Sequence, residues 1–80
     1  MSRDLILYVR AGCHLCTDML RDLEGLRTRI EFRYIVMDVD AEADLAARYG
    51  DRVPVLTAND TEICHYFLDE DCLRTYLESA

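Results

Sequence analysis

The sequence contains no lysine, so its nine basic residues are all arginine, against 16 acidic residues and a formal net charge of −7. With so few cations and no basic stripe, neither nucleic acid nor an anionic membrane surface is an expected partner. Long apolar runs are also missing, and no segment approaches the roughly 20 apolar residues of a membrane-spanning helix. The first apolar run ends at Arg10 after five residues, without the cleavage pattern of a signal peptide, which indicates a cytoplasmic protein.

The 80 residues, 51% of them apolar, have the size of one small domain spanning residues 1–80, which we expect to be monomeric. Four cysteines in so short a chain can form two disulfides in a secreted mini-protein. The missing export pattern and the apolar periodicity of an ordinary core argue against that class. In a reducing compartment, a Cys-x-x-Cys beside a strand–helix unit is more typical of a redox or metal site.

Short strands alternate with helices along the chain. Apolar residues recur at three- and four-residue spacing over residues 14–28, which predicts the first helix. The second strand is apolar on both faces, which predicts that it is covered on both sides. We expect Asp40 to cap a helix that Gly50 follows, and Asn59-Asp60 to turn the chain between two strands. The predicted strands are residues 4–9, 31–39, 53–57 and 62–67, and the predicted helices are residues 14–28, 41–49 and 69 onward.

The predicted element order, βαβαββα, is that of an α/β domain. A helix joins the first two strands, so these strands should be parallel, with a right-handed crossover. The last two strands follow each other through a short turn and should form an antiparallel hairpin. The three helices can then cover both faces of one four-stranded mixed sheet.

The Cys-x-x-Cys motif of Cys13 and Cys16 follows the first strand and opens the first helix. Two cysteines three residues apart on a first helical turn can close a disulfide or open to two thiols. Cys13 should lie beside unpaired backbone N–H groups and the positive end of the helix dipole, which favour a thiolate. The motif therefore predicts reversible thiol–disulfide chemistry. Half of a tetrahedral zinc site has the same spacing, so a metal role stays open.

In its context the motif resembles the glutaredoxin-like branch of the thioredoxin superfamily. A strand and a basic residue, Arg10, precede the dithiol. The segment from Tyr49 to Leu56 resembles that family's helix end, followed by a Val-Pro step into the third strand. The element order agrees as well, so the resemblance covers nearly the whole chain. It implies a thioredoxin-like fold with a four-stranded mixed sheet and three flanking helices.

The resemblance also implies a small thiol–disulfide oxidoreductase. Cys13 is then the exposed nucleophile, and Cys16 is the more buried resolving cysteine. The family holds its Val-Pro proline in the cis form beside the dithiol, so we expect the same of Pro54. A cis bond there would leave the backbone of Val53 free to pair with an extended substrate, in the way that the family pairs with glutathione.

Two further residues are candidates for substrate binding. Arg10 stands where the family often has a basic residue facing the glutathione carboxylate or the reactive thiolate, and the alternative is a solvated arginine. His14 can stabilise the thiolate or pass a proton, and the alternative is an exposed residue without a role. The family's Gly-Gly step before the last helix is replaced by bulky residues at Tyr66–Leu68, which should obstruct part of the glutathione groove.

We expect neither a bound cofactor nor a metal. The expected partner is a disulfide-bearing protein or a small thiol, with glutathione possible as co-substrate. Glutathione or a thioredoxin-type reductase would recycle the dithiol. Cys64 and Cys72 are expected to be buried as small apolar groups. Two other functions stay open: a metal or iron–sulfur site through Cys13 and Cys16, and a non-catalytic binding module with a thioredoxin fold.

Overall fold

The structure is a computed structural model that describes residues 5–79. It has the predicted βαβαββα order, with one short 3-10 helix, η1, added before the second α-helix. The strands are β1 Leu5–Val9, β2 Tyr34–Asp38, β3 Val55–Ala58 and β4 Thr61–His65, and the helices are α1 His14–Leu26, η1 Val39–Ala41, α2 Ala43–Tyr49 and α3 Glu70–Ser79. Residue 4 of the predicted first strand lies outside the described residues. Within residues 5–79, every helix is too short or too polar to cross a membrane.

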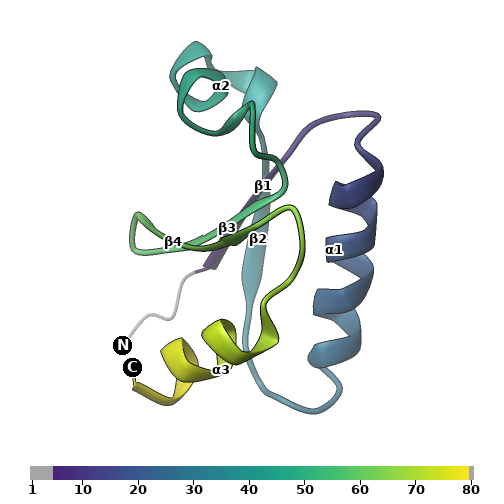
Figure 1. Ribbon diagram of the computed structural model, residues 1–80, viewed down its shortest axis with the longest axis vertical. Coiled ribbons are helices and arrows are strands. Elements are labelled where there is room, and N and C mark those ends of the chain that lie inside the picture. Colours follow the sequence, from purple (N-terminus) through teal and green to yellow (C-terminus); the bar gives the residue numbers. More distant parts are fainter. Residues whose placement is uncertain (1–4, 80) are drawn as a thin grey trace.

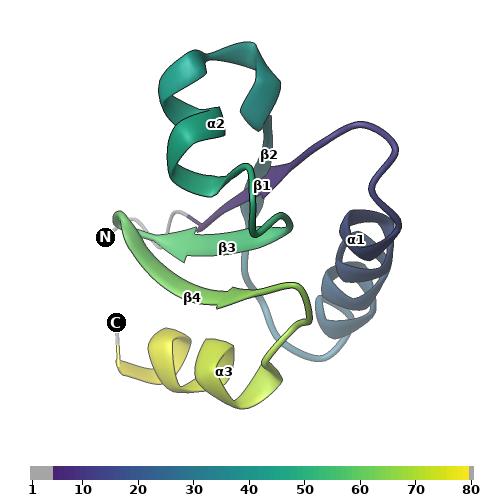
Figure 2. The same cartoon turned by 45° about the horizontal axis from the view of Figure 1, so that its top comes forward.

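The four strands form one mixed sheet, seen nearly edge-on in Figure 1, and Figure 2 shows their order, β2-β1-β3-β4. β1 and β2 are parallel, with Leu7 beside Val36, as their helical crossover requires. β3 runs antiparallel to both β1 and β4. Asn59 and Asp60 make the predicted tight turn between β3 and β4, and both have a positive φ, of 51° and 67°. The predicted four-stranded mixed sheet is confirmed.

Helices cover both faces of this sheet, α1 and α3 on one face and α2 on the other (Figure 2). The larger buried cluster, under α1 and α3, is Leu5, Leu7, Met19, Leu23, Leu26, Phe32, Leu56, Ala58, Leu73 and Leu77. The smaller cluster, under α2, is Tyr8, Val39, Leu45, Tyr49 and Val55. Successive side chains of β1 point to opposite faces, so Leu7 enters the first cluster and Tyr8 the second. Because both faces of β1 are buried, the loop that follows Val9 starts from a firmly held strand.

β2 corrects the prediction that the second strand is covered on both sides. It lies at the edge of the sheet, and Ile35 and Val36 are 58% and 47% exposed. Ile35 lies on the face covered by α2, which has only seven residues and packs mainly on the two central strands, whereas Val36 lies on the opposite face, beside Leu7. β2 is also shorter than predicted, because residues 31–33 lie before the strand and Val39 already belongs to η1.

Helix boundaries differ from the prediction as well. α1 ends at Leu26, two residues early. α2 is preceded by Glu42, which makes no side-chain cap, so the prediction that Asp40 caps this helix is wrong. Asp40 instead accepts hydrogen bonds from Arg10. Gly50 directly follows α2, as expected, but it caps the helix in a right-handed conformation, with a φ of −58°, and not in a left-handed one.

Candidate active site

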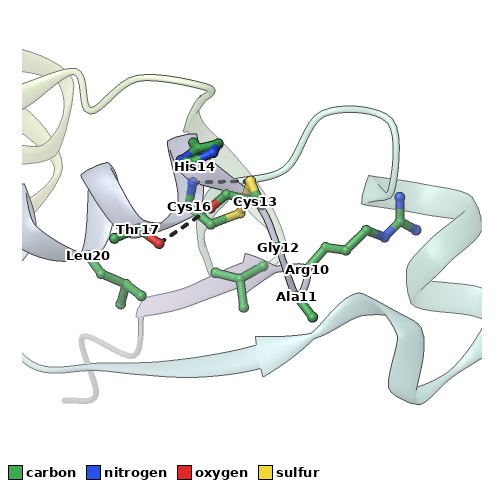
Figure 3. A pocket seen from close by; sticks show the side chains of 9 residues that line it. Arg10, Ala11, Gly12, Cys13, His14, Cys16, Thr17 and Leu20 are labelled. Carbon is green, nitrogen blue, oxygen red and sulfur yellow. Dashed lines mark hydrogen bonds between the residues drawn. A yellow bond between two sulfur atoms is a disulfide. The ribbon is translucent and has the colours of Figure 1, made fainter.

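The two cysteines of the Cys-x-x-Cys motif meet where β1 passes into α1 (Figure 3). Gly12 has a φ of 77°, a left-handed conformation that suits glycine, and it turns the chain from the strand towards the helix. Cys13 takes the N-cap position of α1 in an extended conformation, with φ −94° and ψ 111°. Its Sγ is joined to Sγ of Cys16, and the two Cα atoms are 5.2 Å apart. The first-turn pair therefore has the geometry to close a disulfide.

The two sulfur atoms differ in exposure and in hydrogen bonding. Cys16 is only 3% exposed, whereas Cys13 is half-buried. The backbone N–H of Cys16 donates to Sγ of Cys13 over 3.1 Å, the usual contact of an N-cap side chain. When the disulfide opens, this hydrogen bond and the positive end of α1 both favour negative charge on Cys13. The exposures agree with the predicted order of an accessible Cys13 and a shielded Cys16.

Val53 and Pro54 lie at the same end of the sheet as the dithiol. The peptide bond between them is cis, as predicted. β3 starts directly after Pro54, and its first residue, Val55, pairs with Tyr8 near the end of β1. Among residues 5–79, no hydrogen bond uses the backbone N–H or C=O of Val53. The backbone of Val53 is therefore free for the substrate pairing that the family resemblance implies.

Arg10 does not face the sulfur atoms, and in Figure 3 its guanidinium extends away from Cys13. Its Nε and Nη2 donate to the two carboxylate oxygens of Asp40, each over 3.1 Å. Its Nη1 donates to the carbonyl oxygen of Gly50, also over 3.1 Å. The hydrogen bond with Asp40 raises the pKa of Arg10 still further, so the pair stays charged. Arg10 thus ties the end of β1 to η1 and α2, and the structure does not bring it to the substrate position predicted for it.

Sequence reasoning missed the two partners of Arg10. The carboxyl ends of neighbouring parallel strands lie at one edge of a sheet, and this rule places Asp40, just after β2, close to the end of β1. Gly50 is constrained by close approach, because a Cβ there would lie 2.9 Å from Nη2 of Arg10 and 2.5 Å from the carbonyl oxygen of Ala46. The absence of a side chain at position 50 therefore makes room for the guanidinium.

His14 is exposed and is the first residue of α1. Its imidazole makes no hydrogen bond to another residue in the described part of the chain. In Figure 3 it lies on the opposite side of the disulfide from Ala11 and Leu20. This position leaves the ring open to a substrate, and its role in stabilising a thiolate or passing a proton stays a prediction.

Aromatic residues stand beside the cis-proline, between β4 and α3. β4 ends at His65, two residues earlier than predicted, because Tyr66 has a φ of 65°. The N–H of Tyr66 donates to the carbonyl of Pro54 over 2.9 Å, and its hydroxyl donates to the carbonyl of Asp51 over 3.1 Å. Phe67, the next residue, is 69% exposed. Tyr66 is thus held against the cis-proline loop, and the obstruction of a glutathione groove by the bulky residues stays a prediction.

The other two cysteines belong to β4 and α3. Burial raises the pKa of the half-buried Cys64 thiol. Cys72 is exposed, so the prediction that it is buried is wrong. α3 turns Leu73 and Leu77 inward, and Cys72 therefore points outward, where its hydrogen bond to Asp69 raises the pKa of its thiol. Within residues 5–79, no three His, Cys, Asp or Glu side chains are grouped so as to hold a metal ion.

Comparison with known proteins identifies close relatives. Residues 4–78 match the family model described as a glutaredoxin-like domain (DUF836). An uncharacterised protein of Mycobacterium tuberculosis is 35% identical over 80 residues, covering 92% of this chain and 82% of the relative. The solution structure of a Nitrosomonas europaea protein is 44% identical, with a TM-score of 0.84, covering 95% of this chain and 92% of that one. An X. campestris protein with an X-ray structure is 33% identical, with a TM-score of 0.74, and the match covers 95% of this chain and 97% of that one.

Two redox proteins share the fold at lower sequence identity. E. coli glutaredoxin is 23% identical, with a TM-score of 0.58 over 95% of both chains. Thioredoxin 1 of Thermosipho africanus is 18% identical, with a TM-score of 0.62 over 95% of this chain and 96% of that one. At such identities the likeness concerns the fold alone, which is the predicted thioredoxin-like α/β fold. The chain belongs to the glutaredoxin-like domain family (DUF836).

Proposed function

We propose that the protein is a thiol–disulfide oxidoreductase that uses Cys13 and Cys16. The observation that carries the proposal is the asymmetry of the pair: Cys13 is only half-buried at the N-cap of α1, whereas Cys16 is 3% exposed. A purely structural role fits less well, because the bond joins residues only three apart. So short a loop constrains the unfolded chain much less than a long one does.

The proposed reaction is a two-step exchange. The Cys13 thiolate attacks one sulfur of a substrate disulfide, and the other substrate sulfur leaves as a thiolate and takes up a proton. The Cys16 thiol then gives up its proton and attacks Sγ of Cys13, which releases the second substrate thiol. The substrate gains two electrons and two protons, and the protein is left with the Cys13–Cys16 disulfide. The reverse sequence would oxidise a dithiol substrate.

Neighbouring groups have supporting roles in this proposal. The N–H of Cys16 stabilises negative charge on Sγ of Cys13, both when that sulfur attacks and when it leaves. His14, exposed at the start of the helix, can add positive charge or pass a proton. The unpaired backbone of Val53 can hydrogen-bond an extended substrate, a form of strand addition.

The proposed substrates are disulfides of proteins or of small molecules. An external thiol would return the dithiol to its reduced form, either glutathione or a thioredoxin-type reductase. Bulky Tyr66 and Phe67 stand in place of the family's Gly-Gly step, and this replacement favours a protein disulfide over tightly bound glutathione as substrate. The proposal includes no bound cofactor or metal.

A trapping experiment tests the proposed roles. Reduced Cys16→Ser protein is mixed with bis(2-hydroxyethyl) disulfide and analysed by intact mass and peptide mapping. We expect a stable mixed disulfide on Cys13, whereas the matched Cys13→Ser variant forms little adduct on the shielded Cys16. Exposed Cys72 serves as the internal reference. Equal labelling of Cys13 and Cys72 would mean that Cys13 has no special reactivity and would refute the proposal.

A further inference from the structure

A groove of about 420 Å³ opens beside Cys13, between the end of β1 and the first two turns of α1. We refer to it as the β1–α1 groove. Val9, Ala11, Thr17 and Leu20 line it together with the dithiol. Figure 3 shows Ala11 and Leu20 on one side of the disulfide and His14 on the other. The groove and the reactive sulfur thus form one continuous surface.

The walls of the groove are largely apolar. Val9 and Leu20 pack against the larger core cluster, yet both remain half-buried. Ala11 is exposed and adds a methyl group to the rim. The hydroxyl of Thr17 donates to the carbonyl of Cys13 over 3.4 Å, so it is already engaged. An apolar group that entered this groove would remove apolar surface from water on both partners.

The charge around the groove also favours an uncharged occupant. The chain carries 16 acidic residues. Within the described part of the chain, no aspartate or glutamate lines the groove. The one permanent charge in the lining, the Arg10 guanidinium, is already paired with Asp40. An apolar side chain can therefore enter without leaving a charge buried and unpaired.

We propose that the β1–α1 groove receives the apolar side chain that neighbours the reacting cysteine of a peptide or protein disulfide. This inference rests on the proposed function and names its substrate class. A substrate sulfur must reach Sγ of Cys13 to react, and the groove begins at that residue. The Cα atom of the next substrate residue lies only about 3.8 Å from that of the reacting cysteine, so its side chain is within reach of the groove. The chemistry is the two-electron exchange already described, with the dithiol as reductant.

Two disulfide-linked peptide dimers of equal length and charge test this inference. They differ only in the residue next to cysteine, which is leucine in one and serine in the other. Reduced protein is mixed with each dimer, and formation of the Cys13–Cys16 disulfide is followed by acid quenching and mass spectrometry. We expect the leucine dimer to react about fivefold faster, because its side chain is partly buried in the groove.

Three variants test whether the preference for the leucine dimer arises in the β1–α1 groove. Leu20→Asn, close in size but polar, and Ala11→Asp, on the exposed rim, should each bring the ratio of the two rates close to one. The Ala11 variant tests the groove without disturbing the core. Ile30→Asn is the matched control, because Ile30 is also half-buried against the larger core cluster but lies outside the groove. It should keep the wild-type ratio.

The outcomes separate this inference from the proposed function. Equal rates for the two dimers with the wild-type protein would overturn the groove assignment. So would a preference that survives both Leu20→Asn and Ala11→Asp. In parallel reactions of the same protein preparations, bis(2-hydroxyethyl) disulfide replaces the peptide dimer and reports whether the dithiol reacts at all. A dithiol that reduces this probe without a peptide preference overturns the groove alone, and one that reduces no disulfide overturns both proposals.

Discussion

Arg10 and Asp40 form a two-pronged ion pair across the carboxyl ends of β1 and β2, with Nε–Oδ2 and Nη2–Oδ1 distances of 3.1 Å. A third hydrogen bond, to the carbonyl of Gly50, adds the end of α2 to the same contact. The pair anchors the strand from which the redox loop departs, while the guanidinium points away from Cys13 (Figure 3). This geometry makes Arg10 a supporting residue of the loop.

We expect Arg10→Gln to lower the Tm by a few degrees, because the ion pair is partly exposed and such pairs contribute modestly. Asp40→Asn should have a similar effect, and the double variant should lose little more than either single one. The alkylation rate of reduced Cys13 should change by less than about twofold, since the guanidinium points away from the thiol and Asp40 already neutralises its charge. If Cys13 were alkylated tenfold more slowly in Arg10→Gln but not in Asp40→Asn, Arg10 would instead have a direct role at the thiolate.

The pH dependence of alkylation tests the environment of Cys13. In the reduced protein the N–H of Cys16 and the positive end of α1 should hold the pKa of Cys13 below the value of about 8.5 of an ordinary cysteine. Exposed Cys72 is the comparison within the same chain, because its hydrogen bond to Asp69 raises the pKa of its thiol. Iodoacetamide labelling with peptide mapping should therefore show Cys13 reacting at lower pH than Cys72. The reverse order would contradict the proposed activation.

Asp69 links stability to pH at the start of α3. The backbone N–H of Cys72 donates to Oδ1 of Asp69 over 3.0 Å, and this bond lowers the pKa of the carboxyl below its ordinary value of 3.8. The stabilising contribution is thus complete above pH 3.8 and is lost as the pH falls through the lower, folded-state pKa. Asp69→Ala should lower the Tm by a few degrees at pH 7 and by less in acid, whereas Asp69→Asn should keep most of the cap. A Tm difference that is constant down to about pH 2 would exclude this carboxylate effect.

The exposed edge strand gives a stability test. Ile35→Thr should change the free energy of unfolding by less than about 0.5 kcal/mol, because Ile35 is 58% exposed and threonine suits a strand. Leu7→Ala, at a position that is 0% exposed, should cost about 2–5 kcal/mol. Urea unfolding measures both. A loss above about 1.5 kcal/mol for Ile35→Thr would mean that β2 is covered after all.

The features that sequence alone predicts well are local ones. The dithiol lies within one helical turn, and the Asn59-Asp60 turn depends on neighbouring residues, whereas the cis form of Pro54 was implied by the family resemblance. Alternation of strand and helix then limits the possible topologies, so the sheet could be predicted too. Helix phase also carries a signal that Cys72 points outward, since it precedes the inward-facing Leu73, but the prediction that Cys72 is buried did not use it.

Features that depend on tertiary packing could not be predicted in this way. An apolar pattern on both faces of a strand does not show whether the strand is central or at an edge, so the exposure of Ile35 could not be predicted. Arg10 and Asp40 are 30 residues apart, and their contact depends on how β1 and β2 pair. The β1–α1 groove likewise depends on how far α1 covers Val9.

The most direct test of the dithiol chemistry is the redox equilibrium of Cys13 and Cys16 across defined glutathione buffers, with thiol trapping and mass spectrometry. We predict one reversible two-electron step assigned to these two cysteines, absent from the Cys16→Ser variant, with Cys64 and Cys72 remaining thiols. The midpoint would also indicate whether the protein acts as a reductant or an oxidant. A Cys13–Cys16 pair that forms no reversible bond in any buffer would contradict the proposed function.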